Sequence, residues 1–289
     1  MSGDPAHWRG VFNQWQIGLG GHINIQHYAQ ALDEARRGAA LECGLGPAEL
    51  AARGQTLRPI VERLDFRKEL VPGDAAEISG RLSRDAAGLA ELNGVLTTRP
   101  DSTLAMRHQT SFAPFDLADR QRQPWTEALP ASDPLRAMRP MLEPWMPTQV
   151  PGNAMLTWKG TVEVRDCDEH GLQSPRSLYD IITRGLWAVQ IGFGRHRDSM
   201  AETGAAGGVT AIQVRHGRPA RMGDLLQVHT ALLGFGSTSV RLGHLIRDVT
   251  DGVVVARVEY VTAFFDRSTG KKARPDADYA AKLASLRLA

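Results

Sequence analysis

Apolar and polar residues alternate along this chain with two different periods, and each period predicts a different kind of element. From His22 to Gly44 apolar residues recur at near-helical spacing, which predicts one long helix with Gly44 as its stop. The segment from Trp8 to Ile17 reads as extended. Four strand-sized segments separated by turn formers follow, at Leu57 to Leu70, Ala75 to Ser83, Glu91 to Thr98 and Leu104 to Phe115.

The second part of the chain repeats this order of elements. A strand predicted from Leu156 to Arg165 precedes a helix predicted from Pro175 to Phe193. Four more strands are predicted at Val209 to Arg215, Leu225 to Leu233, Thr238 to Asp248 and Val253 to Phe265. The last element is a short helix from Asp276 to Leu288. The proline-rich segment from Arg120 to Asn153 has no sustained period, which indicates a connector that crosses one domain face.

Glycine and turn residues keep a spacing of 150 residues between the two parts. The matched positions are Gly21 and Gly171, Gly44 and Gly194, Gly73-Asp74 and Gly223-Asp224, and Phe115-Asp116 and Phe265-Asp266. Such repetition indicates one architecture used twice. We therefore predict an N-terminal repeat at residues 1–119, a linker at 120–153 and a C-terminal repeat at 154–289. Each repeat would lay a long helix on an antiparallel sheet, which is an α+β arrangement.

Charge and cysteine content argue against several classes of partner. The chain has 34 Lys and Arg against 32 Asp and Glu, so no strong field attracts nucleic acid or an acidic membrane. Cys43 and Cys167 lie in unrelated contexts and predict neither a disulfide framework nor a metal site. No apolar stretch is long enough to cross a bilayer, and the first ten residues lack a signal-like pattern. We expect a soluble cytoplasmic protein that uses no metal or redox cofactor.

The sharpest local signal is Arg165-Asp166-Cys167-Asp168-Glu169-His170-Gly171, where a strand gives way to a helix. Helix N-termini expose unpaired N–H groups with a partial positive charge, so they stabilise a carbonyl oxygen that gains negative charge. A carboxylate beside such a site could attack the carbonyl carbon or activate a water molecule. Capping of the helix is the other role that suits Asp166 and Asp168. The first repeat has no acid here, because Gly18 is the match of Asp168.

At these residues the chain resembles the hotdog-fold thioesterases of the 4-hydroxybenzoyl-CoA thioesterase superfamily. Members share an Asp-x-Asp-x-x-Gly pattern, then His-Val-Asn-Asn, then a helix with a tyrosine and an acidic-Ala-Arg segment. Residues 166–171 match the first portion, whereas residues 21–24, Tyr28 and residues 33–36 match the rest. The resemblance spans both parts of the chain and implies a double hotdog, like that of acyl-carrier-protein thioesterases.

The resemblance implies an acyl-CoA thioesterase with one working site, in the second repeat. Asp168 falls on the family's catalytic aspartate, as general base or nucleophile, and Gly171 on the glycine whose region polarises the thioester carbonyl. Asp166 and His170 would support the position and charge of Asp168. Two departures stand out, because the first repeat lacks the acid and Leu172-Gln173-Ser174 replaces His-Val-Asn in the second.

Further polar residues are candidates for substrate binding. His22 and Asn24 could hold a water molecule or a carbonyl group, although a histidine at a helix start more often caps or packs. Gln190 could orient a water molecule, but an ordinary surface glutamine is the commoner case. Arginine suits the phosphates of CoA. The basic candidates are Arg63, Arg67, Lys68, Arg215, Arg218 and Arg221, of which Arg63, Lys68 and Arg218 are preferred. His108 and His244 show no partner pattern.

Two other functions stay open. A hotdog enoyl-thioester hydratase or dehydratase would act on related thioesters, although the chain has no His-x-x-x-Gly-x-x-x-x-Pro run. A non-catalytic acyl-CoA-binding module would fit the loss of acids from one repeat. The acyl group, the choice between CoA and acyl carrier protein, and homo-oligomerisation through sheet edges are open as well.

Overall fold

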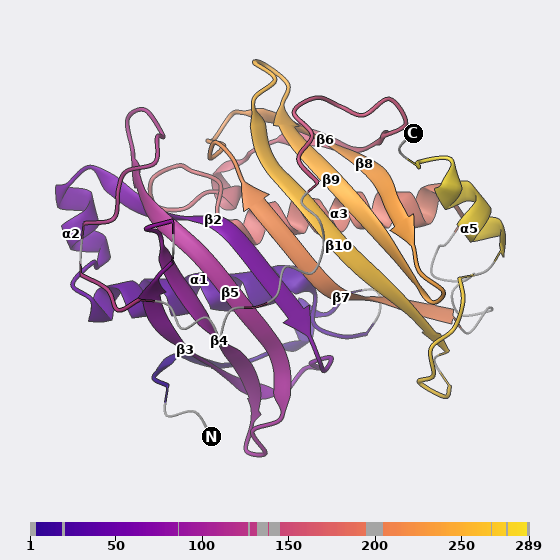
Figure 1. The fold of residues 1–289 in the computed structure, drawn as a ribbon, viewed down its shortest axis with the longest axis horizontal. Coiled ribbons are helices and arrows are strands. Elements are labelled where there is room, and N and C mark those ends of the chain that lie inside the picture. Colours follow the sequence, from indigo (N-terminus) through magenta and orange to yellow (C-terminus); the bar gives the residue numbers. More distant parts are fainter. Residues whose placement is uncertain are drawn as a thin grey trace. The chain divides into compact units, whose positions relative to one another are not determined.

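The computed structural model describes residues 4–18, 21–85, 87–126, 128–131, 138, 145–194, 205–266, 268–275 and 277–287. The chain forms two compact units, Met1–Leu142 and Glu143–Ala289. Figure 1 shows that each unit has a sheet of long strands and one long helix.

The first unit is an antiparallel sheet with a long helix on one face. Its strands are β1 (Ala6–Val11), β2 (Gln55–Phe66), β3 (Ala75–Arg84), β4 (Ala90–Arg99) and β5 (Leu104–Asp116). Its helices are α1 (Ile25–Glu42), α2 (Pro47–Ala52) and a short 3-10 helix, η1 (Gln14–Gln16). The strand order is β1-β3-β4-β5-β2, and all neighbours are antiparallel. Helix α1 packs against β1 and β3 (Figure 1).

The second unit has the same plan. Its strands are β6 (Met155–Thr161), β7 (Ala205–His216), β8 (Leu225–Phe235), β9 (Ser239–Asp248) and β10 (Val254–Asp266). Its helices are η2 (Val164–Asp166), α3 (Pro175–Gly192) and α5 (Ala277–Ala284). The strand order is β7-β10-β9-β8-β6, again antiparallel, and α3 packs against β6 and β8.

Matching elements of the two units keep the offset of 150 residues. Helices α1 and α3 begin at Ile25 and Pro175, and strands β5 and β10 begin at Leu104 and Val254. The turn glycines Gly21 and Gly171 have φ values of 84° and 70°, a left-handed region where glycine avoids a steric penalty. The prediction of an α+β fold with one long helix on an antiparallel sheet in each half is therefore confirmed.

Several predicted boundaries differ from the structure. Helix α1 begins at Ile25 rather than at His22, because Asn24 is its N-cap with extended backbone. The strand predicted to reach Arg165 ends at Thr161, and η2 follows it. Helix α2 was not predicted, although Pro47 occupies its first turn, where the missing N–H is tolerated.

The described ends of the connector lie on the sheets of their own units. Trp125 in the first unit packs edge-on against Phe112 at 5.7 Å between ring centroids. In the second unit the backbone N–H of Trp145 donates to Glu259 Oε1 at 2.9 Å. The indole of Trp145 lies over Gly243, where an added Cβ would meet the ring at 2.7 Å. Within the described residues, the C-terminal end of the connector is thus seated on the sheet.

Each unit buries one histidine at the same place under its long helix. His108 of β5 pairs across the sheet with Gly94, and His244 of β9 pairs with Val258. Gly94 lies 150 residues before His244, and Val258 lies 150 residues after His108. The two histidines therefore occupy the same cross-strand pair of the repeated fold, but each is on a different strand of that pair. His244 Nδ1 pairs with Thr230 Oγ1 at 2.7 Å, and its ring reaches Gly185 of α3, where an added Cβ would meet it at 3.3 Å.

These histidines predict a loss of stability in mild acid. Burial lowers the pKa of His108 to about 4 and that of His244 to about 3, from an ordinary value of 6.5. The folded pKa lies below the unfolded one, so the free energy of unfolding is complete above pH 7 and declines as the pH falls from about 6.5 towards 4. By pH 5 the expected loss is about 2 kcal/mol per histidine.

The measurement is urea unfolding at pH 7 and pH 5 for the wild type and for His108→Val, which copies Val258. The variant should lose about 2 kcal/mol less than the wild type between the two pH values. An identical pH dependence in both proteins would show that His108 takes up its proton in the folded state.

Candidate active site

The candidate site is the loop between η2 and α3, from Cys167 to Ser174. Cys167 and Gln173 form an isolated antiparallel bridge that closes the loop at its base. The Asp168 N–H donates to Leu172 O at 2.8 Å, and the Gly171 N–H donates to Asp168 O at 3.1 Å. The positive φ of Gly171 allows this tight turn. The loop is thus held by its own backbone immediately before the long helix.

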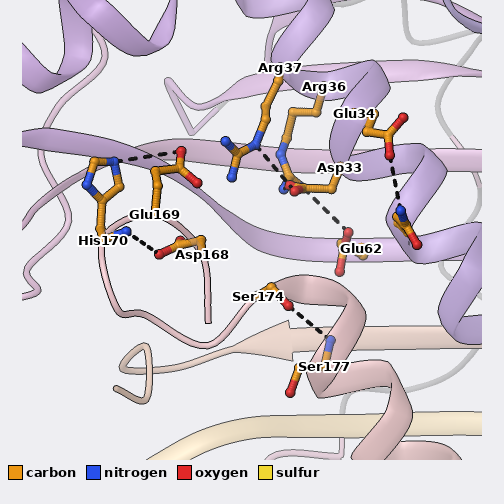
Figure 2. Close-up of polar contacts among 11 residues, drawn as sticks. Asp33, Glu34, Arg36, Arg37, Glu62, Asp168, Glu169, His170, Ser174 and Ser177 are labelled. Carbon is orange, nitrogen blue, oxygen red and sulfur yellow. Dashed lines mark hydrogen bonds and ion pairs between the residues drawn. The ribbon is translucent and has the colours of Figure 1, made fainter. Parts of the chain in front are cut away.

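The Asp168 side chain completes this loop. Its Oδ1 accepts the N–H of His170 at 2.9 Å (Figure 2). The same oxygen accepts the N–H of Leu172 at 3.1 Å. The side chain is half-buried. Two hydrogen bonds to one oxygen fix the orientation of the carboxylate, which a catalytic group requires and a structural group also uses.

Neither acid of the motif caps the long helix. Ser174 is the N-cap of α3, and its Oγ accepts the N–H of Ser177 at 3.2 Å (Figure 2). Asp166 instead completes the capping box of η2, whose N-cap is Glu163, since its Oδ2 accepts the N–H of Glu163 at 2.9 Å. The helix-capping alternative drawn from the sequence is therefore wrong for both Asp166 and Asp168, because a residue closer to the helix takes that role.

The N–H groups around Gly171 are already used. Those of His170 and Leu172 donate to Asp168 Oδ1, and that of Gly171 donates to Asp168 O. The first turn of α3 offers another donor, because Pro175 has no N–H and the N–H of Arg176 makes no hydrogen bond within the described residues. The N–H of Arg176 is therefore a donor that the loop leaves available.

His170 contacts Asp168 through its backbone. Its ring Nε2 lies 3.8 Å from Glu169 Oε1 (Figure 2). The predicted support of Asp168 by His170 is thus supplied by the backbone N–H, which any residue except proline provides.

In the first unit, the residues matched to the family motif sit at the start of α1. His22 Nδ1 lies 3.6 Å from Glu69 Oε1, and Asn24 is the N-cap of α1 without a side-chain hydrogen bond to the helix. Tyr28 is buried, and its hydroxyl accepts the N–H of Leu70 at 3.2 Å. Burial raises the pKa of Tyr28 well above its ordinary value.

The preferred basic candidates are not all available for phosphate. Arg218 bridges Asp248 at 3.0 Å and Asp251 at 2.5 Å, so its charge is neutralised within its own unit. Arg63 donates to Gln109 Oε1 at 2.9 Å, while Lys68 is exposed.

Gln190 is not a surface residue. It is 8% exposed on α3, which shows that the commoner interpretation of an ordinary surface glutamine is wrong. Its Oε1 has no hydrogen-bond partner within the described residues. Its role towards a substrate stays a prediction.

Sequence reasoning missed a buried charged network in the first unit. Arg36 of α1 is 1% exposed and is paired with Asp33 on its own helix. Its Nη1 also lies 3.6 Å from Oε1 of Glu62, a β2 residue with 1% exposure (Figure 2). Asp33 takes a second cation, Arg37, at 3.3 Å. The signal was present in the sequence, because Arg36 follows Leu32 and Ala35 on the apolar stripe of the helix.

No cluster of three or more His, Cys, Asp or Glu suited to a metal ion occurs among the described residues. Among the helices that the structure describes, none has the length and apolar character to span a bilayer.

Residues 164–283 match the family model of the thioesterase-like superfamily. A protein described as an oleoyl thioesterase from Lactobacillus plantarum has a similar structure, with a TM-score of 0.70 and 12% identity over 91% of this chain and 97% of its own. An acyl-ACP thioesterase from Bacteroides thetaiotaomicron gives a TM-score of 0.64 and 13% identity over 88% and 96%. The 12:0-ACP thioesterase from Umbellularia californica gives a TM-score of 0.63 and 13% identity over 89% of this chain and 93% of its own. No curated protein matches the chain by sequence.

These likenesses cover most of the chain at low identity, so they show the fold. The family match covers the second unit from η2 to α5 and leaves out β6. It confirms the resemblance seen in the motif at residues 166–171. The chain therefore has the double-hotdog fold, and residues 164–283 of its second unit are similar to the thioesterase-like superfamily.

Proposed function

We propose that the chain hydrolyses an acyl thioester at the loop that precedes α3. The observation that carries this proposal is the Asp168 carboxylate, which is half-buried and held by two backbone N–H groups beside the first turn of a long helix. The match of residues 164–283 to the thioesterase-like superfamily supports the reaction type.

In the proposed reaction Asp168 acts on the electron-poor carbonyl carbon of the thioester. As general base it takes a proton from water while the water oxygen attacks that carbon, and the proton then passes to the departing thiolate. As nucleophile it displaces the thiolate to form an acyl anhydride, which water hydrolyses to the acid. Both routes yield a carboxylic acid and a thiol, without a metal or redox cofactor.

The negative charge on the carbonyl oxygen would be stabilised at the start of α3. The Arg176 N–H is the donor that the geometry favours, and the partial positive charge of the helix N-terminus adds to it. Gly171 would then serve the site by shaping the turn, and Asp166 by fixing η2 in front of it.

The proposed substrates are acyl-CoA or acyl carrier protein thioesters. Proteins of the same fold that are described as acyl-ACP and oleoyl thioesterases support this class. His22, Asn24, Gln190, Arg63 and Lys68 remain candidates for contacts with the substrate, whereas Arg218 is expected to act only through its pairs with Asp248 and Asp251.

A thiol-release assay tests the reaction type. The purified chain should release free thiol from at least one member of a panel of short, branched, aromatic and long acyl-CoAs and acyl carrier proteins. Crotonyl-CoA is included, because loss of its conjugated double bond without thiol release would identify a hydratase. Saturable acyl-CoA binding with neither reaction would identify a binding module and overturn the proposal.

A further inference from the structure

The sheet face of the second unit that lies opposite α3 has an excess of positive charge. His244 of β9 points towards α3, so Arg241 and Arg247, at alternate positions, point to the other face. The cross-strand partners of these residues extend the same face over β6, β7 and β10. Its basic side chains within the described strands are Lys159, Arg215, Arg241, Arg247 and Arg257.

The acidic residue on this face is already paired with other groups. Among the described strands Glu259 is the acid that faces this side, and it is 2% exposed. Arg241 donates to Glu259 Oε2 at 2.5 Å, and the backbone N–H of Trp145 donates to Oε1 at 2.9 Å. Neither oxygen therefore balances Arg215 or Arg257.

Arg215 and Arg257 face each other directly across β7 and β10. Like charges at such positions are destabilising, since the side chains start only about 5 Å apart. Arg257 Nε donates to the Pro147 carbonyl at 2.7 Å, while Arg215 Nε is buried without a hydrogen-bond partner in the described structure. Burial, and then the charge of Arg215, lower the pKa of Arg257.

The first unit provides an internal comparison. The residues 150 positions earlier are Asp65 and Arg107, which are also directly opposite, on β2 and β5. There a carboxylate stands opposite the arginine, although the ion pair that Asp65 forms is with Arg67. The second unit has Arg215 at the position of this carboxylate, so two like charges stand opposite each other.

We infer that Arg215 and Arg257 form a binding site for a phosphate group, on the face of the second unit's sheet opposite α3. Two guanidinium groups on adjacent strands can offer a phosphate several charge-assisted hydrogen bonds. Its negative charge would offset the repulsion between the two arginines, at a place where the first unit has the acidic residue Asp65. The inference does not depend on thioester hydrolysis, because it uses no residue of the Asp168 loop.

Thermal unfolding at constant ionic strength tests the site with inorganic phosphate, adenosine 3′,5′-bisphosphate and adenosine. A ligand that binds only the folded state raises Tm by an amount that grows with the logarithm of its concentration above Kd. We expect phosphate and the bisphosphate to raise Tm by about 3 °C at about ten times their Kd, and adenosine to have no effect. An equal rise at a tenfold lower concentration of bisphosphate would identify a nucleotide phosphate as the occupant, and equal potency would identify free phosphate.

The decisive variant is Arg215→Asp, which recreates the cross-strand pair of the first unit. It should raise Tm by about 2 °C without ligand, because repulsion becomes attraction, and it should abolish the response to phosphate. Arg215→Gln removes the charge with less perturbation and should also abolish the response. Arg274→Asp, at an exposed position beyond the end of β10, is the control with the same charge change and should retain it.

Two results would overturn the inference. One is the absence of a Tm rise with phosphate in the wild type. The other is an equal rise in Arg215→Asp and in the wild type, which would place the anion elsewhere. Neither readout involves thiol release, so a failure here is distinguishable from a failure of the proposed activity.

Discussion

Asp168→Asn should lower kcat/KM for thiol release by at least about 100-fold, because general base or nucleophilic action by a carboxylate is worth that much or more. The substitution leaves the loop intact, because the amide oxygen of asparagine can still accept the N–H groups of His170 and Leu172. The measurement is the initial rate of thiol release for both proteins, with urea unfolding to confirm equal stability.

Asp224→Asn is the matched control. Asp224 supports a turn in the same unit, where its Oδ2 accepts the N–H of Arg221 at 2.9 Å, and it has no proposed part in the chemistry. This variant should keep kcat/KM within about twofold of the wild type. A similar loss in both variants would mean that aspartate-supported turns, rather than the Asp168 carboxylate, account for the activity.

Arg36→Ala should reduce the free energy of unfolding by about 3–5 kcal/mol, as expected when one partner of a buried ion pair is removed. Glu62 would keep its charge at 1% exposure and lose the guanidinium 3.6 Å away. Arg36 also lies over the ring of Phe112, at 5.9 Å from its centroid, so packing is lost as well. Urea unfolding of the purified protein measures the change.

Two comparisons separate burial from charge. Arg37→Ala removes the second cation that pairs with Asp33. The Arg37 side chain is 33% exposed, so its loss should lower the free energy of unfolding by at most about 1 kcal/mol. The double variant Arg36→Leu with Glu62→Ile copies Leu186 and Ile212 of the second unit and should recover most of the loss. Equal losses for Arg36→Ala and Arg37→Ala would contradict the buried network.

The order and type of the elements could be predicted from the sequence, because the helical and strand periods of apolar residues gave the same order of elements in both halves of the 150-residue repeat. Glycines at matched turns marked where each long helix begins and ends and where β3 and β8 begin, and these turns have the positive φ values that favour glycine. Element ends were less predictable. Ser174 rather than Asp168 caps α3, and Thr161 ends β6, because hydrogen bonds of single side chains and short 3-10 turns leave little trace in periodicity.

The candidate site was predictable in its location but not in its geometry. The motif at residues 166–171 identified the loop, yet only the structure shows that Asp168 occupies the N–H groups around Gly171 and leaves that of Arg176. The charge of Arg218 is neutralised by Asp248 and Asp251, which are 30 and 33 residues away along the chain. Such pairing follows from strand register, which the sequence alone does not specify.

The proposed reaction requires that the Asp168 carboxylate performs chemistry on a bound thioester. The most direct measurement compares acyl-CoA binding and single-turnover thiol release in the same preparations of wild type and Asp168→Asn. We predict an unchanged Kd, within about twofold, together with release slowed by at least about 100-fold. Release at the wild-type rate from the Asp168→Asn complex would contradict the claim.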